Sequence, residues 1–153
     1  MINLNTFNEE TVDWQPLPGP DGSAADHIGM SILNIDDNAK IVDVLFKFAA
    51  NEKILWHKHT SDFNTFVVKG EHRIYSLDGE LREVRPAGTF KATQASEDPH
   101  TEGGGDEDVV ILFSLRPYDD ERPIYEILDE DHDVVAEMTF NAMKDIYLAT
   151  EKH

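Results

Sequence analysis

Two histidines with one residue between them are the side chains of this sequence best suited to metal chemistry. His57 and His59 flank Lys58, and His100 lies farther along the chain. Successive side chains of a β-strand point to opposite faces, so His57 and His59 would share a face if they lie on a strand. An imidazole from His100 could then complete one side of a divalent metal and leave other positions open. We therefore predict that these three histidines are metal ligands.

The residues around the pair predict short strands. An apolar run at residues 54–56 leads into His57, and the polar residues 60–62 break the pattern. Residues 63–69 and 71–77 then predict two further strands on either side of Gly70. The alternative is a solvated or hydrogen-bonded pair without metal, because seven histidines in 153 residues make a His-x-His spacing unsurprising.

The other histidines have no such context. His27, His132 and His153 are expected at the surface, and His72 could either line a barrel or face solvent. The sequence has no cysteine, which excludes disulfides, thiolate metal sites and cysteine nucleophiles. Any metal must therefore use nitrogen and oxygen ligands. No side chain is assigned as a catalytic acid or base.

The remaining elements must position these histidines. Further strands are predicted at residues 30–35, 40–48, 88–93 and 109–115, and Asp78-Gly79 is the best hairpin turn. Many short strands with frequent turns and no helices between them indicate an antiparallel sandwich or barrel. The three glycines at 103–105 are interpreted as a flexible loop. Residues 123–128 and 133–138 predict a closing hairpin, followed by a helix with Thr139 as its N-cap.

The length of 153 residues fits a single domain. Residues 1–28 contain several prolines and glycines and are interpreted as an N-terminal arm, laid over the domain or exchanged with a neighbouring subunit. Residues 29–138 are assigned to the β-barrel and residues 139–151 to the C-terminal helix.

The strong negative charge excludes two classes of partner. With 13 basic and 31 acidic residues, the net charge of −18 repels nucleic acid and anionic membrane surfaces. The longest apolar run, residues 109–113, is far too short to span a membrane. The N-terminal residues lack the basic and apolar regions of a signal peptide, so a cytoplasmic location is expected.

Four segments of the sequence carry a resemblance to the cupins. They are HKHTSDFNTFVVKGEHRIY (57–75), PAGTF (86–90), DPHT (98–101) and VDWQPLPG (12–19). The chain is most similar to the 2,4'-dihydroxyacetophenone dioxygenase-like group and to the cupin sensor domain of ChrR-type anti-sigma factors. The resemblance implies an all-β fold, a double-stranded β-helix (jelly-roll) barrel, with the histidines inside it. It also implies a homodimer or homotetramer.

One position departs from the cupin pattern. Phe63 stands seven residues before Gly70, where many cupins have a metal-binding glutamate. Its neighbours Asp62 and Asn64 would face the opposite side of the strand. The resemblance therefore implies a site of three neutral imidazoles whose metal charge no ligand offsets, which favours an anionic substrate such as an enolate. Phe63 is instead expected to shape the substrate-binding pocket and to exclude water.

The resemblance implies an oxidoreductase, a metal-dependent dioxygenase that uses O2 to cleave a carbon–carbon bond in a small hydroxy-ketone or diketone. Fe(II) is the favoured metal because open coordination positions suit oxygen activation, and zinc, nickel and copper also bind imidazole. Two alternatives stay open. One is a non-catalytic cupin that binds a metal or ligand, like the ChrR-type sensor, and the other is a cupin isomerase or lyase.

Overall fold

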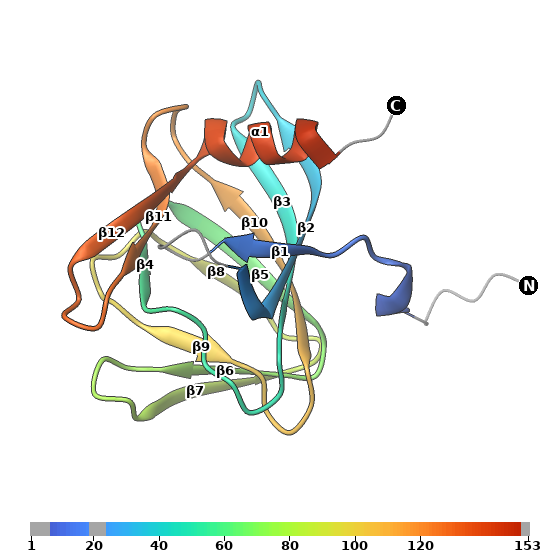
Figure 1. The fold of residues 1–153 in the computed structure, drawn as a ribbon, viewed down its shortest axis with the longest axis vertical. Helices are drawn as coiled ribbons and strands as arrows, with labels where there is room; N and C mark the ends of the chain where they lie inside the picture. The colour runs from blue at the N-terminus through green and yellow to red at the C-terminus, as the bar shows by residue number, and fades with distance from the viewer. Residues whose placement is uncertain (1–6, 19–23, 151–153) are drawn as a thin grey trace, which may run out of the picture.

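The computed structural model describes residues 7–18 and 24–150 as one β-rich body with a single C-terminal helix (Figure 1). Its strands are β1 (Gln15–Pro18), β2 (Ala24–Asp36), β3 (Ile41–Phe48), β4 (His57–His59), β5 (Asp62–Lys69), β6 (Glu71–Tyr75), β7 (Leu81–Pro86), β8 (Phe90–Thr93), β9 (Thr101–Gly103), β10 (Val109–Arg116), β11 (Pro123–Leu128) and β12 (Val134–Thr139). The helix α1 covers Phe140–Thr150, and a 3-10 turn covers Glu9–Thr11.

All the described strand pairs are antiparallel, and they form one large and two small sheets. The large sheet has the order β1-β2-β3-β10-β5-β8, and the small ones have the orders β12-β11-β4 and β7-β6-β9. In Figure 1 the small sheets lie at the left and bottom of the molecule, and α1 lies along its top. This is the predicted all-β barrel with a C-terminal helix.

The core lies on the inner face of the large sheet. Inward positions alternate along β3 and β10, where Val44 lies opposite Phe113. Phe46 packs edge-on against Phe113, with ring centroids 5.2 Å apart. Burying one such side chain contributes about 1.5–3 kcal/mol. The large sheet therefore supplies a rigid apolar wall against which the polar residues of the smaller sheets are held.

Two local predictions are confirmed in detail. The Asp78-Gly79 turn joins β6 to β7, with Gly79 at a φ of 85° that favours glycine. At the start of α1, the hydroxyl of Thr139 accepts a hydrogen bond from the backbone N–H of Ala142 at 3.1 Å. Phe140 and Met143 of the helix are buried, as the apolar stripe predicts. The predicted closing hairpin is also present, because β11 pairs with β12.

The interpretation of residues 103–105 as a flexible loop is wrong for Gly103, which ends strand β9. Gly104 and Gly105 do lie in the connection to β10, but all three glycines are buried. A side chain at Gly103 would overlap the backbone oxygen of Glu52, so glycine here permits close packing of two backbone segments. The three consecutive glycines suggested a mobile segment, whereas the close approach of the Glu52 backbone requires a residue without a side chain at Gly103.

The described part of the predicted N-terminal arm contributes strand β1 and the start of β2 to the large sheet, so it does not lie over the barrel. The segment before β1 is attached by an ion cluster. Strand β1 pairs with β2. Ahead of it, the Glu9 carboxylate lies 2.6 Å from the Lys47 ammonium and 2.5 Å from that of Lys69. Hydrogen bonds from Lys47 and then Lys69 lower the pKa of Glu9, and they outweigh the opposing effect of burial. The carboxylate therefore joins the arm to both β3 and β5.

Replacing Glu9 with glutamine is expected to lower the free energy of unfolding by about 1 kcal/mol at neutral pH. The pKa of Glu9 is lower in the folded chain, so its contribution is present above the unfolded value of 4.5 and is lost as the pH falls through the folded value. Urea unfolding of Glu9→Gln and the parent chain should therefore converge in acid. The matched control is Glu10→Gln at the exposed neighbouring position, which should follow the parent at every pH.

Candidate metal centre

Strand β4 holds His57 and His59 on one inward face, as the alternation predicts, and Lys58 points the other way. On one side β4 pairs with β11, where Tyr125 lies opposite His59. On its other side, His57 and His100 exchange backbone hydrogen bonds of 3.0 and 2.9 Å. This direct pairing places His100 beside His57, although His100 lies 43 residues farther along the chain. The three predicted histidines are thus adjacent.

The ligand atoms of these histidines converge with a fourth group, the carboxylate of Glu102. One nitrogen from each of His57, His59 and His100 and one Glu102 oxygen all lie within 4.8 Å of one another. His57, His59 and Glu102 are buried, and the His100 side chain is 16% exposed. We call these four residues the metal-ligand group. The set has the size and the nitrogen and oxygen donors of a transition-metal site.

Solved structures show what kind of barrel carries this group. No family model matches the sequence, and no curated protein is significantly similar to it. In structure, an RmlC-like cupin protein from Ralstonia eutropha aligns with a TM-score of 0.69 at 20% identity, over 97% of this chain and 87% of its own. An acetylacetone dioxygenase from Acinetobacter johnsonii aligns with a TM-score of 0.66 at 14% identity, over 99% and 94%.

The chain has the cupin fold. A third solved structure, Rhodobacter sphaeroides SigE in complex with the anti-sigma ChrR, aligns with a TM-score of 0.54 at 18% identity over 70% of this chain. The alignment spans 50% of the chain in that structure. Among the residues described here, no helix is long and apolar enough to cross a membrane. The resemblance inferred from the sequence therefore extends to the three-dimensional fold.

Glu102 is the residue that the sequence analysis missed. One carboxylate oxygen lies 3.2 Å from His57 Nε2 and 3.1 Å from His100 Nε2. The expectation of three imidazoles with no negative charge among them is therefore corrected. A signal was available, because His100 and Glu102 repeat the one-residue spacing of His57 and His59. No strand was predicted at residues 101–103, where the structure has β9, so the shared face of His100 and Glu102 was not considered.

The other oxygen of Glu102 binds His72. Its distance to His72 Nε2 is 3.0 Å, and His72 is only 1% exposed. The structure thus decides between the two alternatives for His72, which lines the barrel interior from β6. It holds the carboxylate from the side away from the other histidines. His72 is therefore suited to orient Glu102, in the way that outer residues orient metal ligands.

The charges of the metal-ligand group are strongly coupled. Burial opposes ionisation of Glu102, but attraction to His72 and hydrogen bonds from His100, His57 and His72 hold its pKa well below the usual 4.5. Burial likewise opposes protonation of His57, yet the hydrogen bond and charge of Glu102 raise its pKa. Metal binding must displace such protons, so we expect metal affinity to fall as the pH is lowered.

His59 provides the test of whether this group fits a metal. Both of its ring nitrogens are buried and have no hydrogen-bond partner among the described residues. Burial, followed by the neighbouring His57, lowers the pKa of His59 well below 6.5, so the ring is neutral with a free lone pair. A buried polar group without a partner is unfavourable. A cation bound to the metal-ligand group would use that lone pair, and the residues therefore fit a metal.

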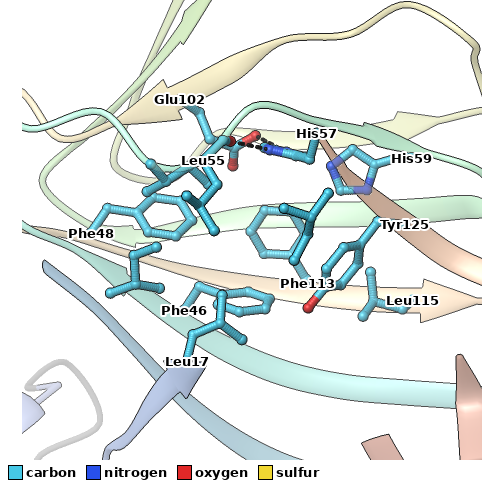
Figure 2. A pocket seen from close by; sticks show the side chains of 13 residues that line it. Leu17, Phe46, Phe48, Leu55, His57, His59, Glu102, Phe113, Leu115 and Tyr125 are labelled. Carbon is cyan, nitrogen blue, oxygen red and sulfur yellow. Dashed lines mark hydrogen bonds and ion pairs between the residues drawn. The ribbon is translucent and has the colours of Figure 1, made fainter. Parts of the chain in front are cut away.

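A hydrogen bond also fixes the orientation of His57. Its Nδ1–H donates to the backbone carbonyl of Leu55 at 2.8 Å, which leaves Nε2 directed at the group. Figure 2 shows this ring beside Glu102, with His59 next to it. This second contact selects the ring nitrogen that a metal would use.

Phe63 lies where a pocket wall is needed. Its ring stacks on His59, with centroids 4.0 Å apart and an interplanar angle of 24°, and it is 7% exposed. Phe63 lines a polar cavity of about 200 Å³ together with His59, His100 and Glu102. The cavity reaches solvent at Arg82, Gln94, Ser96 and Asp98, which are exposed. Contact of Phe63 with a substrate remains a prediction.

The other predicted surface histidines lie outside this group. His132 is exposed and packs against Trp56, with ring centroids 5.3 Å apart. His27 is half-buried on β2, and His153 lies outside the described residues.

Gly103→Ala is expected to weaken metal binding by displacing the neighbouring Glu102. The added methyl would overlap the Glu52 backbone oxygen, so β9 must shift and carry Glu102 with it. We expect a loss of about 3 kcal/mol in unfolding free energy and about tenfold weaker metal binding, measured by urea unfolding and metal titration. The matched control is Gly79→Ala, because no atom lies within 4 Å of its new methyl. It should lose about 1 kcal/mol to backbone strain and keep its metal affinity.

Proposed function

We propose that this cupin is a metal-dependent dioxygenase that cleaves a carbon–carbon bond in a small hydroxy-ketone or diketone. The observation that carries the proposal is the convergence of three imidazoles and one carboxylate at the inner end of a polar cavity. The likeness to an acetylacetone dioxygenase over nearly the whole chain supports it.

His57, His59, His100 and Glu102 would hold the metal. The mixture of imidazole and carboxylate donors favours Fe(II), and zinc, nickel and copper also bind imidazole. Bound Fe(II) would supply the O2 chemistry that no amino-acid side chain provides. The role of the protein is to hold the donors, position the substrate and exclude water.

The charge of the centre favours a substrate with one negative charge. With Glu102 ionised, a divalent metal leaves one positive charge, which an enolate of a ketone would neutralise. Carbon–carbon cleavage of such an enolate with incorporation of O2 gives two oxygenated fragments. The carboxylate therefore limits the substrate to a monoanion, whereas three histidines alone would leave two positive charges.

The polar cavity offers a further group for positioning this substrate. Arg85 is 7% exposed, and its guanidinium donates to Glu83 at 2.7 and 3.2 Å and to Thr65 at 3.3 Å. A guanidinium has five N–H donors, so Arg85 retains donors for a carbonyl oxygen. Phe63 and Phe113 line the same cavity with apolar rings. We expect them to exclude water from the bound ketone.

Oxygen uptake tests the proposal. Iron-loaded protein should consume O2 in proportion to a small diketone or hydroxy-ketone, and His57→Ala should abolish this uptake and the bound iron. His132→Ala, an exposed histidine outside the metal-ligand group, is the matched control and should keep both. Turnover of the same ketones without O2 would identify an isomerase or lyase instead.

A non-catalytic cupin is the second candidate, favoured by the likeness to the SigE complex with the anti-sigma ChrR. Such a protein would bind metal through the same four residues but would show no O2 uptake with any ketone. Tight metal binding together with inactive iron-loaded protein would therefore favour this alternative.

A further inference from the structure

The metal-ligand group borders a second cavity, which is smaller and more apolar than the polar one. This apolar chamber has a volume of about 40 Å³ and is bounded at one end by His57, His59 and Glu102. Its other walls are aliphatic and aromatic side chains, as Figure 2 shows. His59, Glu102 and Phe113 line both cavities. The metal-ligand group is therefore accessible from two compartments of opposite polarity.

Most of the residues that line the chamber are buried. Of its lining residues only Ile54 and Leu55 are partly exposed, and the others are buried. The polar cavity, in contrast, has four exposed residues at its mouth. Any guest of the chamber must therefore pass beside Ile54 and Leu55 or come through the metal-ligand group.

At the end of the chamber away from the metal-ligand group, the Tyr125 hydroxyl has no partner among the described residues. The hydroxyl of Tyr125 is buried and makes no hydrogen bond to the described residues, and Tyr125 is 7% exposed. In Figure 2 the hydroxyl points away from His59 and towards the apolar end of the chamber. Burial raises the pKa of this phenol, so it remains a protonated hydrogen-bond donor. Such a hydroxyl is unfavourable without an acceptor, which indicates that a guest supplies one.

We propose that the apolar chamber is the binding site for dioxygen, while the organic substrate occupies the polar cavity. The assignment rests on the proposed dioxygenase function. A chamber of about 40 Å³ is too small for a six-carbon guest, because benzene fits a cavity of about 150 Å³. Water needs two to four polar partners, and the apolar end offers only the Tyr125 hydroxyl. Dioxygen is small enough for the chamber, and because it is apolar it does not need several polar partners.

The Tyr125 hydroxyl also has a purpose in this arrangement. Dioxygen is a weak hydrogen-bond acceptor, but its oxygen atoms become stronger acceptors as they take up electrons from the organic substrate. A donor fixed in a dry chamber acts most strongly on such developing charge. Tyr125 is therefore assigned as a positioning residue for the oxygen molecule.

Xenon binding tests the chamber without any turnover. Crystals of the purified protein under xenon pressure should show xenon between Leu55, Phe113 and Tyr125, because xenon occupies dry apolar cavities. Leu55→Phe should fill the chamber and exclude the gas, whereas Leu33→Phe, at a half-exposed position on β2, should not. Density for ordered water in place of xenon would overturn the assignment.

Steady-state kinetics then tests whether the guest is dioxygen. In Leu55→Phe the KM for O2 should rise about tenfold, which corresponds to about tenfold weaker O2 binding. The KM for the ketone should not change. Tyr125→Phe should still bind xenon but lose about tenfold in kcat/KM for O2. Ile54→Phe provides a second filled variant if Leu55→Phe does not fold, and metal content and thermal unfolding verify each protein.

The outcomes separate the chamber from the proposed function. If the parent protein consumes no O2 with any ketone, the dioxygenase proposal fails whatever xenon shows. If the parent consumes O2 but both filled variants keep its KM, the chamber assignment alone fails. A raised KM for the ketone in Tyr125→Phe would instead place part of the organic substrate in the chamber, and would also overturn the assignment.

Discussion

Glu102→Gln is expected to weaken both metal binding and the metal-free fold. The carboxylate is the shared negative partner of His57, His72 and His100, and it is 2% exposed. Removing one partner from a buried charge network costs about 3–5 kcal/mol. Glutamine keeps the shape and one acceptor oxygen, so we expect the lower end of that range. Loss of an anionic ligand should lower metal affinity by about 100-fold.

Urea unfolding of the metal-free proteins and calorimetric metal titration measure the two effects of Glu102→Gln. The matched control is Glu97→Gln, because the Glu97 side chain is 82% exposed and pairs with Lys58 at the surface. That variant should change either quantity very little. If Glu102→Gln lost metal affinity without any change in metal-free stability, the carboxylate would not be the electrostatic centre of the group.

His59→Leu is expected to weaken metal binding but to stabilise the metal-free protein, whereas Glu102→Gln should weaken both. The His59 nitrogens have no partners among the described residues, and the ring packs against Phe63. Leucine removes two unpaired polar atoms while keeping a buried apolar side chain. We therefore expect the metal-free protein to gain about 1 kcal/mol in unfolding free energy. Metal binding should fall by at least about 100-fold, because a ligand has been lost.

The same substitution at His72 is the control for His59→Leu. His72 is equally buried but hydrogen-bonds Glu102 at 3.0 Å, so His72→Leu should destabilise the metal-free protein. Thermal unfolding with and without added metal compares the two variants. Destabilisation of the metal-free protein by His59→Leu would show that its ring nitrogens have partners, and would contradict their assignment as metal-directed donors.

Much of the candidate site followed from local patterns in the sequence. The His57 and His59 side chains share a face because strand alternation is a property of the backbone alone. The resemblance to the cupins placed Phe63 at the position of a metal-binding glutamate, and its ring does lie against His59. The Thr139 cap and the Asp78-Gly79 turn likewise depend on neighbouring residues only. Such features are encoded within a few residues, so the sequence determined them.

The contacts between distant segments were decided by the tertiary structure. The pairing of His57 with His100 joins residues 43 positions apart, and no local pattern predicts its register. Gly103 packs against the Glu52 backbone as the last residue of strand β9, where the glycines alone suggested a loop. That strand places Glu102 among the histidines and supplies the negative charge of the group.

The sequence by itself therefore determined the fold class, the inward face of β4 and three of the four members of the metal-ligand group. Only the tertiary structure decided that Glu102 is the fourth member, that His72 supports it, and that Tyr125 carries an unpaired hydroxyl into an apolar chamber. The physical reason is that alternation is short-range, whereas the environment of a buried polar atom is set by every segment that packs around it.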